Sequence, residues 1–446
     1  MSALRRLIAL RTERPRFVAA SLVVLGMLLA WPLFDVSLRH LKTAGTGYDW
    51  VSPFHFNDFG AYAVAIARWY NGEPVYWQRA DGGYFGTYLY PPVYLLVFLP
   101  WFELGQFGFL QGLPLTEHPA DVSGLLFEVF SVGLLWVALQ ALAREAGLEL
   151  AWYDRLVALW ALVGFQPLLF SVKLGQVSAL VAALFCFAYV AMQRGERAQG
   201  PVERFASGAL TTLAAGIKPY YATAGAHLLR DRDRFAGAIG GLVGIGVLSL
   251  LVFGVENHLG YLDVLLWGKG WGEEPLAIYL WHPGYYEPLY AVSQRSTLLA
   301  TVVRASLVVA VAGLAFLARE ADVGRATFAL GLSVYPLVAP EAYTQDFVAM
   351  LVAALVLVAV EFDRRDGLPW VPVLAVGLLA VHAFGLRLLL YHLPAWLPLA
   401  STLKGAAPVL QPGIWGNLSL LGLAMYRVAE PAGLVRIPWG SPVGES

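Results

Sequence analysis

An ionisable carboxylate, Asp58, lies just outside the first long apolar segment of the chain. The residue before it, Asn57, is an effective helix N-cap, so the sequence predicts a helix over 57–71 with Asp58 in its first turn. There the helix dipole favours the ionised form of the carboxylate. Such a group can take a proton from a hydroxyl, or it can simply stabilise the start of the helix, and the local sequence fits both interpretations.

The helix that carries Asp58 is predicted to be amphipathic. Apolar side chains recur along it at spacings of three and four residues and form one stripe: Phe59, Tyr62, Ile66 and Trp69. A helix of this kind lies flat at a membrane surface, so we expect Asp58 at the head of an interfacial helix. An aromatic, glycine-rich loop follows and ends in Tyr88-Leu89-Tyr90-Pro91-Pro92, where Tyr90 is a candidate substrate-binding residue.

Lys218 is the most unusual cation in the chain, because it falls near the middle of a predicted membrane span over 205–229. A lysine at the centre of a bilayer costs about 2.5–3.5 kcal/mol, so such a residue usually faces a cavity or a partner. Pro219 would break the helix beside it. Two interpretations stay open: an ammonium that reaches a phosphate, and an internally paired or snorkelling lysine.

Two further segments place polar residues among aromatic ones. The long loop 256–296 contains Arg295, whose guanidinium group has the geometry to bind a phosphate in a bidentate manner. The short turn 341–346 gathers polar groups against two predicted spans. Membrane anchoring and helix capping are the alternatives. Together with Lys218, these segments and the start of the first helix supply the candidate substrate-binding residues: Asn57, Tyr90, His282, Arg295, Tyr343 and Gln345. For Gln176, at a predicted span boundary, we expect a structural role in backbone or helix–helix hydrogen bonds.

The composition indicates an all-α polytopic membrane protein. The chain has 446 residues, of which 58% are hydrophobic and 14% charged, whereas soluble domains carry about 25% charged residues. Its mean hydropathy is +0.62. Apolar runs recur from end to end, so we expect a single integral membrane domain over 1–446. The net charge of −1 gives no argument for nucleic acid, and the single cysteine, Cys186, excludes an intrachain disulfide. The scattered histidines show no metal-ligand spacing, so neither metal nor cofactor is expected.

The arginine-rich N-terminal segment, 1–16, is predicted to be cytoplasmic. Strict alternation then places the loops 36–87 and 256–296 outside and the tail 428–446 inside. It also places the loops 144–155 and 194–204 outside, although three arginines in 194–204 disagree. Either the charge bias is weak there, or 205–229 is a broken pair of half-spans. About twelve spans are predicted: 17–35, 88–104, 122–143, 156–172, 176–193, 205–229, 235–255, 297–317, 327–340, 345–361, 369–390 and 413–427.

Four features occur in a characteristic order along the chain. An Asp-Phe helix follows the first span, Tyr-Pro-Pro opens the second, Gly175-Gln176 comes next, and Ile217-Lys218-Pro219 follows. This order resembles glycosyltransferase family 87, the polyprenyl-phosphate-mannose-dependent α-mannosyltransferases and their relatives in the GT-C superfamily. The resemblance covers roughly residues 15–350.

The resemblance implies a GT-C-type fold with interfacial helices in the first outer loop. It implies an active site that faces away from the cytoplasm, in a multi-pass protein of the plasma membrane. Asp58 matches the catalytic acidic position of the superfamily, and Lys218 matches a recurrent lysine of the family. The donor is then a sugar on polyprenyl or dolichyl phosphate, and the acceptor is a glycolipid, a glycan or a protein. Membrane lipid surrounds the protein, and no nucleic acid is a partner.

The expected reaction is transfer of a hexose, with mannose as the family's sugar, to an acceptor hydroxyl with inversion. Asp58 would act as general base, and Lys218 or Arg295 would offset the charge that develops on the departing lipid phosphate. Two alternatives stay open: a transporter or flippase of lipid-linked sugars, and another lipid-linked-sugar enzyme such as an O-antigen-type ligase. The transporter explains the spans and Lys218, but it explains an acidic interfacial helix less well.

Overall fold

Long apolar helices make up most of the described part of this computed structural model. The structure describes residues 3–40, 56–80, 82–84, 86–111, 121–267, 285–286, 288–339, 342–391, 394 and 396–434. Its helices and strands are, in chain order, α1 Ala3–Ala9, α2 Pro15–His40, α3 Asn57–Tyr70, η2 Pro92–Tyr94, α4 Leu95–Gly105, α5 Gly108–Gln111, α6 Asp121–Glu145, α7 Trp152–Val163, α8 Gln166–Leu174, α9 Ser178–Ala198, α10 Pro201–Ile217, η3 Pro219–Arg230, α11 Arg232–Trp267, β1 Tyr285–Tyr286, α12 Tyr290–Ser293, α13 Thr297–Leu317, α14 Gly324–Val338, β2 Ala342–Tyr343, η6 Thr344–Asp346, α15 Phe347–Phe362, α16 Trp370–Tyr391, α17 Ala400–Gly405, α18 Ala407–Leu410 and α19 Pro412–Ala429.

The prediction of an all-α polytopic membrane protein is confirmed. Six helices in the described part of the chain are long and apolar enough to cross a membrane: Pro15–Asp35, Asp121–Glu145, Ser178–Ala198, Arg232–Trp267, Thr297–Leu317 and Thr344–Phe362. The pair α7 and α8, bent by 68°, counts as a seventh if it forms one span. Length and composition therefore support six or seven spans, fewer than the predicted twelve. Helix α4 is shorter than the predicted span 88–104, and it ends where Gly105 packs against Ser123 at the start of α6.

One end of the helices is tied together by arginines, and we call it the arginine end. Arg14 donates to the backbone oxygen of Arg364 at 3.0 Å. Arg325 pairs with Asp363 across 2.5 Å. The N-terminal segment and the turn after α15 thus lie at the same end, as the sequence predicted.

Two loops join the arginine end against expectation. Arg234, at the start of α11, pairs with Glu196 at 2.7 Å, and Gly324, at the start of α14, lies directly against the same Glu196 carboxylate. Arg194 in turn pairs with Glu145 at 2.9 Å. The predicted alternation is therefore wrong for both loops: 144–155 and 194–204.

The interruption of the helix at Lys218 contributes to the difference between the predicted and the observed positions of these loops. Helix α10 ends at Ile217, Lys218 is extended (φ −129°, ψ 106°), and Pro219 starts the 3₁₀ segment η3. The η3 segment turns back along α10, so that Thr211 and His227 approach to 3.5 Å. The predicted span 205–229 is thus a broken pair, the second of the two options that the sequence left open. The arginines in the preceding loop, 194–204, correctly indicated that this loop lies at the arginine end.

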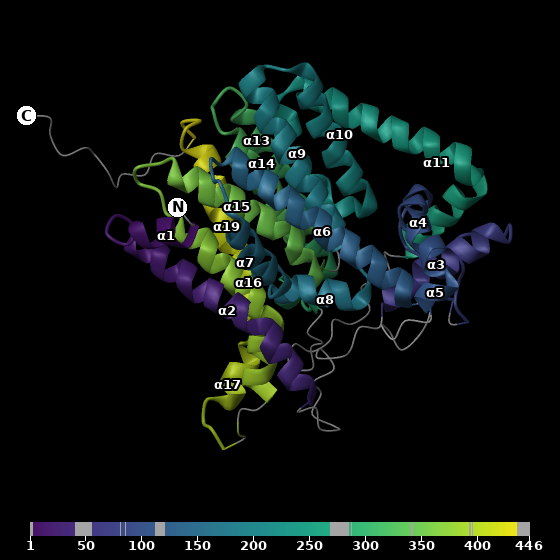
Figure 1. Ribbon diagram of the computed structural model, residues 1–446, viewed down its shortest axis with the longest axis horizontal. Coiled ribbons are helices and arrows are strands. Elements are labelled where there is room, and N and C mark those ends of the chain that lie inside the picture. The colour runs from purple at the N-terminus through teal and green to yellow at the C-terminus, as the bar shows by residue number, and fades with distance from the viewer. Residues whose placement is uncertain are drawn as a thin grey trace, which may run out of the picture.

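At the opposite end, α3 packs over α4 and α6 (Figure 1). The Tyr62 ring stacks on Phe98 with a centroid distance of 4.1 Å, and Phe59 lies 5.6 Å from Phe127. The predicted helix over 57–71 is therefore present as Asn57–Tyr70, with its stripe buried except for the partly buried Trp69. The far end of α11 returns to this cluster (Figure 1), where Asn257 accepts from the Val75 backbone at 2.9 Å.

A two-stranded antiparallel sheet links the loop after α11 to the turn before α15. Tyr285 pairs with Tyr343, and Tyr286 pairs with Ala342. The Tyr286 hydroxyl donates to Asn417 Oδ1 at 3.0 Å inside the helical core. This link fixes the backbone of Tyr343 just before Asp346.

The positions of the loops predict which sites are accessible from each side of the membrane. In a Cys186→Ser background, Ala198→Cys should react with a membrane-impermeant maleimide only after lysis, because the 194–204 loop lies at the arginine end. Gln294→Cys, exposed at the opposite end of α13, should react in intact cells. Ser333→Cys, which is fully buried, is the unreactive control. Labelling of Ala198→Cys in intact cells would contradict this arrangement.

Candidate active site

The start of α3 is held by the junction between α8 and α9. Phe56 adopts a left-handed backbone conformation (φ 44°, ψ 35°), and its N–H donates to the backbone oxygen of Lys173 at 3.0 Å. Gly175 also has a positive φ of 75°, and a Cβ at this position would lie 2.8 Å from Phe59 Cβ. Glycine therefore permits both the turn and the close approach. The Lys173 side chain is fixed in turn by Asp35, at 2.7 and 2.9 Å.

This junction presents Gln176 to Asp58. The Gln176 amide nitrogen donates to Asp58 Oδ2, and its amide oxygen accepts from the Tyr90 hydroxyl at 3.0 Å. The Tyr62 hydroxyl lies 3.3 Å from that of Tyr90. Asp58, Gln176, Tyr90 and Tyr62 thus form one hydrogen-bonded chain. The hydrogen bond from Gln176 joins the α8–α9 junction to α3, so it links helices as the sequence predicted, and it also orients Asp58.

The environment of Asp58 favours a base. Burial raises the pKa of Asp58 above its ordinary value, while the Gln176 hydrogen bond and the positive charge of Lys218 act in the opposite direction. Side chains of the described residues form no hydrogen bond with Asp58 Oδ1, and the residue is only half-buried. One carboxylate oxygen is therefore oriented, and the other is left to accept a proton.

Lys218 is paired with a carboxylate that the sequence analysis did not single out. Its ammonium donates to Asp346 Oδ1 at 2.8 Å, and both side chains are buried. Asp346 also accepts from the Tyr221 hydroxyl at 3.1 Å, from the Tyr220 hydroxyl at 3.3 Å and from the Tyr343 backbone at 3.2 Å. The paired lysine, one of the two interpretations of Lys218, is thus present. Its charge still acts on Asp58 and Tyr90.

The other predicted residues are distributed around this centre. Asn57 is the first residue of α3 rather than its N-cap, and its side chain is exposed. Gln345 is buried, and its amide oxygen accepts no hydrogen bond from the described residues. Arg295 is exposed, and none of the described side chains pairs with its guanidinium group. His282 lies outside the described residues. Among the described residues, the structure brings Asp58, Tyr90, Lys218 and the Tyr343 backbone together.

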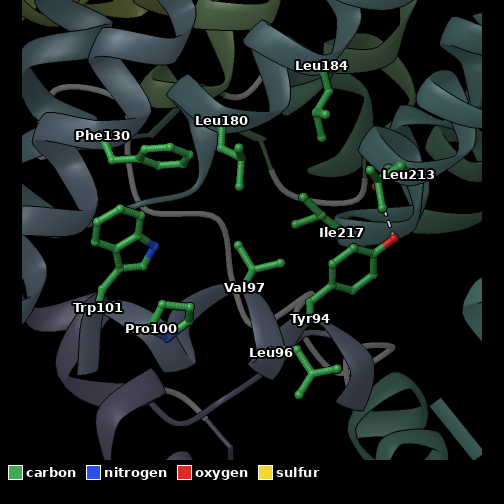
Figure 2. Close-up of a pocket in the computed structure, with 10 residues that line it drawn as sticks. All are labelled: Tyr94, Leu96, Val97, Pro100, Trp101, Phe130, Leu180, Leu184, Leu213 and Ile217. Carbon is green, nitrogen blue, oxygen red and sulfur yellow. Dashed lines mark hydrogen bonds between the residues drawn. The ribbon is translucent and has the colours of Figure 1, made fainter. Parts of the chain in front are cut away.

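One apolar cavity has a volume of about 320 Å³ (Figure 2). It lies between α4, α6, α9 and α10, and Ile217, the residue before Lys218, is part of its wall. The Tyr94 hydroxyl is turned away from the apolar space by a 3.0 Å hydrogen bond to the Leu213 backbone oxygen. All ten lining side chains are apolar or aromatic: Tyr94, Leu96, Val97, Pro100, Trp101, Phe130, Leu180, Leu184, Leu213 and Ile217.

The site shows no metal-binding arrangement among the described residues, where no three His, Cys, Asp or Glu side chains are close enough to hold an ion. The charged groups in its centre are two carboxylates and one ammonium: Asp58, Asp346 and Lys218. The expectation that no metal takes part stays a prediction.

The Lys218–Asp346 pair predicts a specific stability pattern. Removal of one partner from a buried ion pair costs about 3–5 kcal/mol, because the other charge stays buried, whereas replacement of both by apolar residues is often neutral. Lys218→Met should therefore lower the thermal unfolding temperature in detergent. The double variant Lys218→Met/Asp346→Leu should recover most of that loss. Equal destabilisation by the single and the double variant would show that the pair does not determine the stability of this region.

A comparison with protein families assigns the chain to one family. The model of glycosyltransferase family 87 matches residues 88–340, which is more than half of the 446 residues. The matched segment includes Tyr90, Gln176 and Lys218, whereas Asp58 and Asp346 flank it. None of the curated proteins and none of the solved structures matches the chain. The chain belongs to glycosyltransferase family 87 and is a membrane glycosyltransferase.

Proposed function

We propose that this glycosyltransferase moves a hexose, mannose, from a polyprenyl- or dolichyl-phosphate donor to an acceptor hydroxyl, with Asp58 as general base. The observation that carries the proposal is the orientation of Asp58. Gln176 holds one carboxylate oxygen, and the described side chains leave the other without a hydrogen bond. The acceptor is a glycolipid, a glycan or a protein.

The chemistry requires a base at the acceptor hydroxyl. As the new glycosidic bond forms, Asp58 Oδ1 takes the hydroxyl proton, a role that contributes about 10²–10⁴ in rate. Burial of Asp58 raises its pKa and thereby makes it a stronger base than an exposed aspartate. Attack from the face opposite the lipid phosphate inverts the anomeric centre.

Cations stabilise the departing lipid phosphate. The ammonium of Lys218 has three N–H donors, and one of them is directed to Asp346. Asp346 keeps three neutral donors of its own, two tyrosine hydroxyls and one backbone N–H, so Lys218 can also bind a phosphate without leaving Asp346 unsatisfied. Arg295, without an acidic partner among the described residues, is the second candidate for this phosphate.

The apolar cavity suits the lipid part of the donor. Its walls carry aliphatic and aromatic side chains, and it lies next to the residue that precedes Lys218 (Figure 2). An isoprenoid chain in this cavity would place its phosphate near the ammonium. Because the lipid phosphate is itself the leaving group, neither a nucleotide site nor a metal ion is needed.

Two alternative functions, a transporter or flippase of lipid-linked sugars and a lipid-linked-sugar ligase, are distinguished from this proposal by different arguments. Family membership favours an enzyme over a transporter or flippase. A ligase would use a lipid-diphosphate donor, which a donor panel distinguishes directly. We place the enzyme in the plasma membrane with its active site on the extracytoplasmic face, because Asp58 lies opposite the arginine end.

Asp58→Asn should reduce transfer by about 10²–10⁴, since the amide cannot take the acceptor proton. Loss of a charge near a helix start costs under about 1 kcal/mol, so the thermal unfolding temperature should change little. The matched control is Glu103→Gln, which removes an exposed carboxylate that contacts Tyr70 at the end of α3. The measurement is turnover of the purified variants. Wild-type activity of Asp58→Asn would exclude it as the base.

Leu184→Trp should fill part of the apolar cavity and raise the KM for the donor by at least about tenfold, because lipid contacts are lost. The KM for the acceptor should stay within about threefold, since the acceptor hydroxyl does not use this cavity. Leu251→Trp, on the exposed face of α11, is the control for tryptophan in the membrane. Equal donor KM values in both variants would exclude the cavity as the lipid site.

A further inference from the structure

Glu128 is a buried carboxyl group that the proposed chemistry leaves unused. It lies in α6, is 1% exposed, and neither of its oxygens has a hydrogen-bond partner among the described residues. The surrounding helix has the length and composition of a membrane span. An ionisable group at such a position is costly, and its presence suggests a functional role with a specific neighbour.

The packing of α6 directs Glu128 towards the start of α3. Gly124 lies one turn before Glu128 on the same face of α6, and a Cβ at Gly124 would lie 2.6 Å from Phe56 Cβ. The Phe127 ring packs on Phe59, 5.6 Å away. Glu128 therefore lies beneath the first turns of α3, where Asp58 interacts with it electrostatically.

Asp58 and Glu128 have different surroundings. Asp58 is half-buried, accepts a hydrogen bond from Gln176 and is near the Lys218 ammonium. Glu128 has neither a donor nor a cation among the described residues. Two neighbouring carboxyl groups in an apolar setting do not both ionise readily, and the one without support keeps its proton.

We propose that Glu128 is a positioning residue for Asp58, which as a neutral acid supports the α3 start and favours the ionised form of the base. This inference rests on the proposed function of Asp58. In the reaction the acceptor O–H bond breaks and the proton passes to Asp58, while Glu128 keeps its own proton throughout. The ionisable groups that interact electrostatically with Asp58 come from four segments: Tyr62 on α3, Tyr90 before η2, Glu128 on α6 and Lys218 after α10.

The test compares Glu128→Gln with Glu128→Leu by the pH dependence of kcat/KM. Gln has the size and dipole of a neutral carboxyl group, so the acid limb, on which Asp58 loses its proton, should stay in place. Leu removes that dipole, which makes ionisation of Asp58 less favourable. Its acid limb should move upward by about one pH unit, so that the rate at a fixed pH on the limb falls about tenfold.

An infrared measurement of the purified protein in the absence of substrates gives a second readout. The carbonyl stretch of a protonated carboxylic acid should be present in the wild type at neutral pH and diminished in Glu128→Gln. Absence of this difference would overturn the proposal, as would a downward shift of the acid limb in Glu128→Gln. An unchanged limb in Glu128→Leu would show a purely structural role and would also overturn it.

The Asp58→Asn variant separates this inference from the proposed function. If Asp58→Asn is inactive and the Glu128 variants behave like the wild type, only the role of Glu128 is wrong. If Asp58→Asn keeps the acid limb and the activity, the limb belongs to another group, and both proposals are overturned. If Glu128→Leu fails to fold, Glu128→Gln decides through its infrared band and its acid limb.

Discussion

The hydrogen bond from Gln176 to Asp58 is the interaction on which the proposed site depends. It joins the head of an amphipathic helix to the junction of two helices that are far away in the sequence. The junction can approach because Gly175 has no side chain, and because Phe56 accepts a left-handed backbone held by Lys173. A carboxylate with one oxygen fixed in this way is oriented before any substrate binds, which is the condition for efficient proton transfer.

The second half of the site is electrostatic. Lys218 lies at a break between α10 and η3, where its ammonium is balanced by Asp346 and acts on Asp58 as well. A lone ammonium in this apolar setting would be unfavourable, and Asp346 with its tyrosine donors makes it tolerable. Ile217, the residue before Lys218, lines an apolar cavity, and this combination suits the lipid-phosphate donor that we propose (Figure 2).

Local patterns predicted the local features well. The helix over 57–71 followed from its apolar spacing, although Asn57 is not its N-cap, and the break at Lys218 followed from Pro219. Contacts between distant segments could not be predicted, because periodicity carries no information about them. Gln176 binds Asp58 across 118 residues, and Lys218 binds Asp346 across 128. Strict alternation of spans placed the 194–204 loop at the wrong end. The reason is that α4 is too short for an ordinary span and that α10 with η3 turns back. The arginines in the loop indicated the correct end.

The most direct measurement of the central claim is turnover by the purified protein with a panel of sugar donors. We expect transfer from polyprenyl-phosphate hexoses, with inversion at the anomeric carbon and without added nucleotide. No transfer is expected from nucleotide sugars or from lipid-diphosphate sugars. Retention of configuration, or turnover with a nucleotide or lipid-diphosphate donor in place of the lipid phosphate, would contradict the assignment of Asp58 as a base acting on a lipid-phosphate donor.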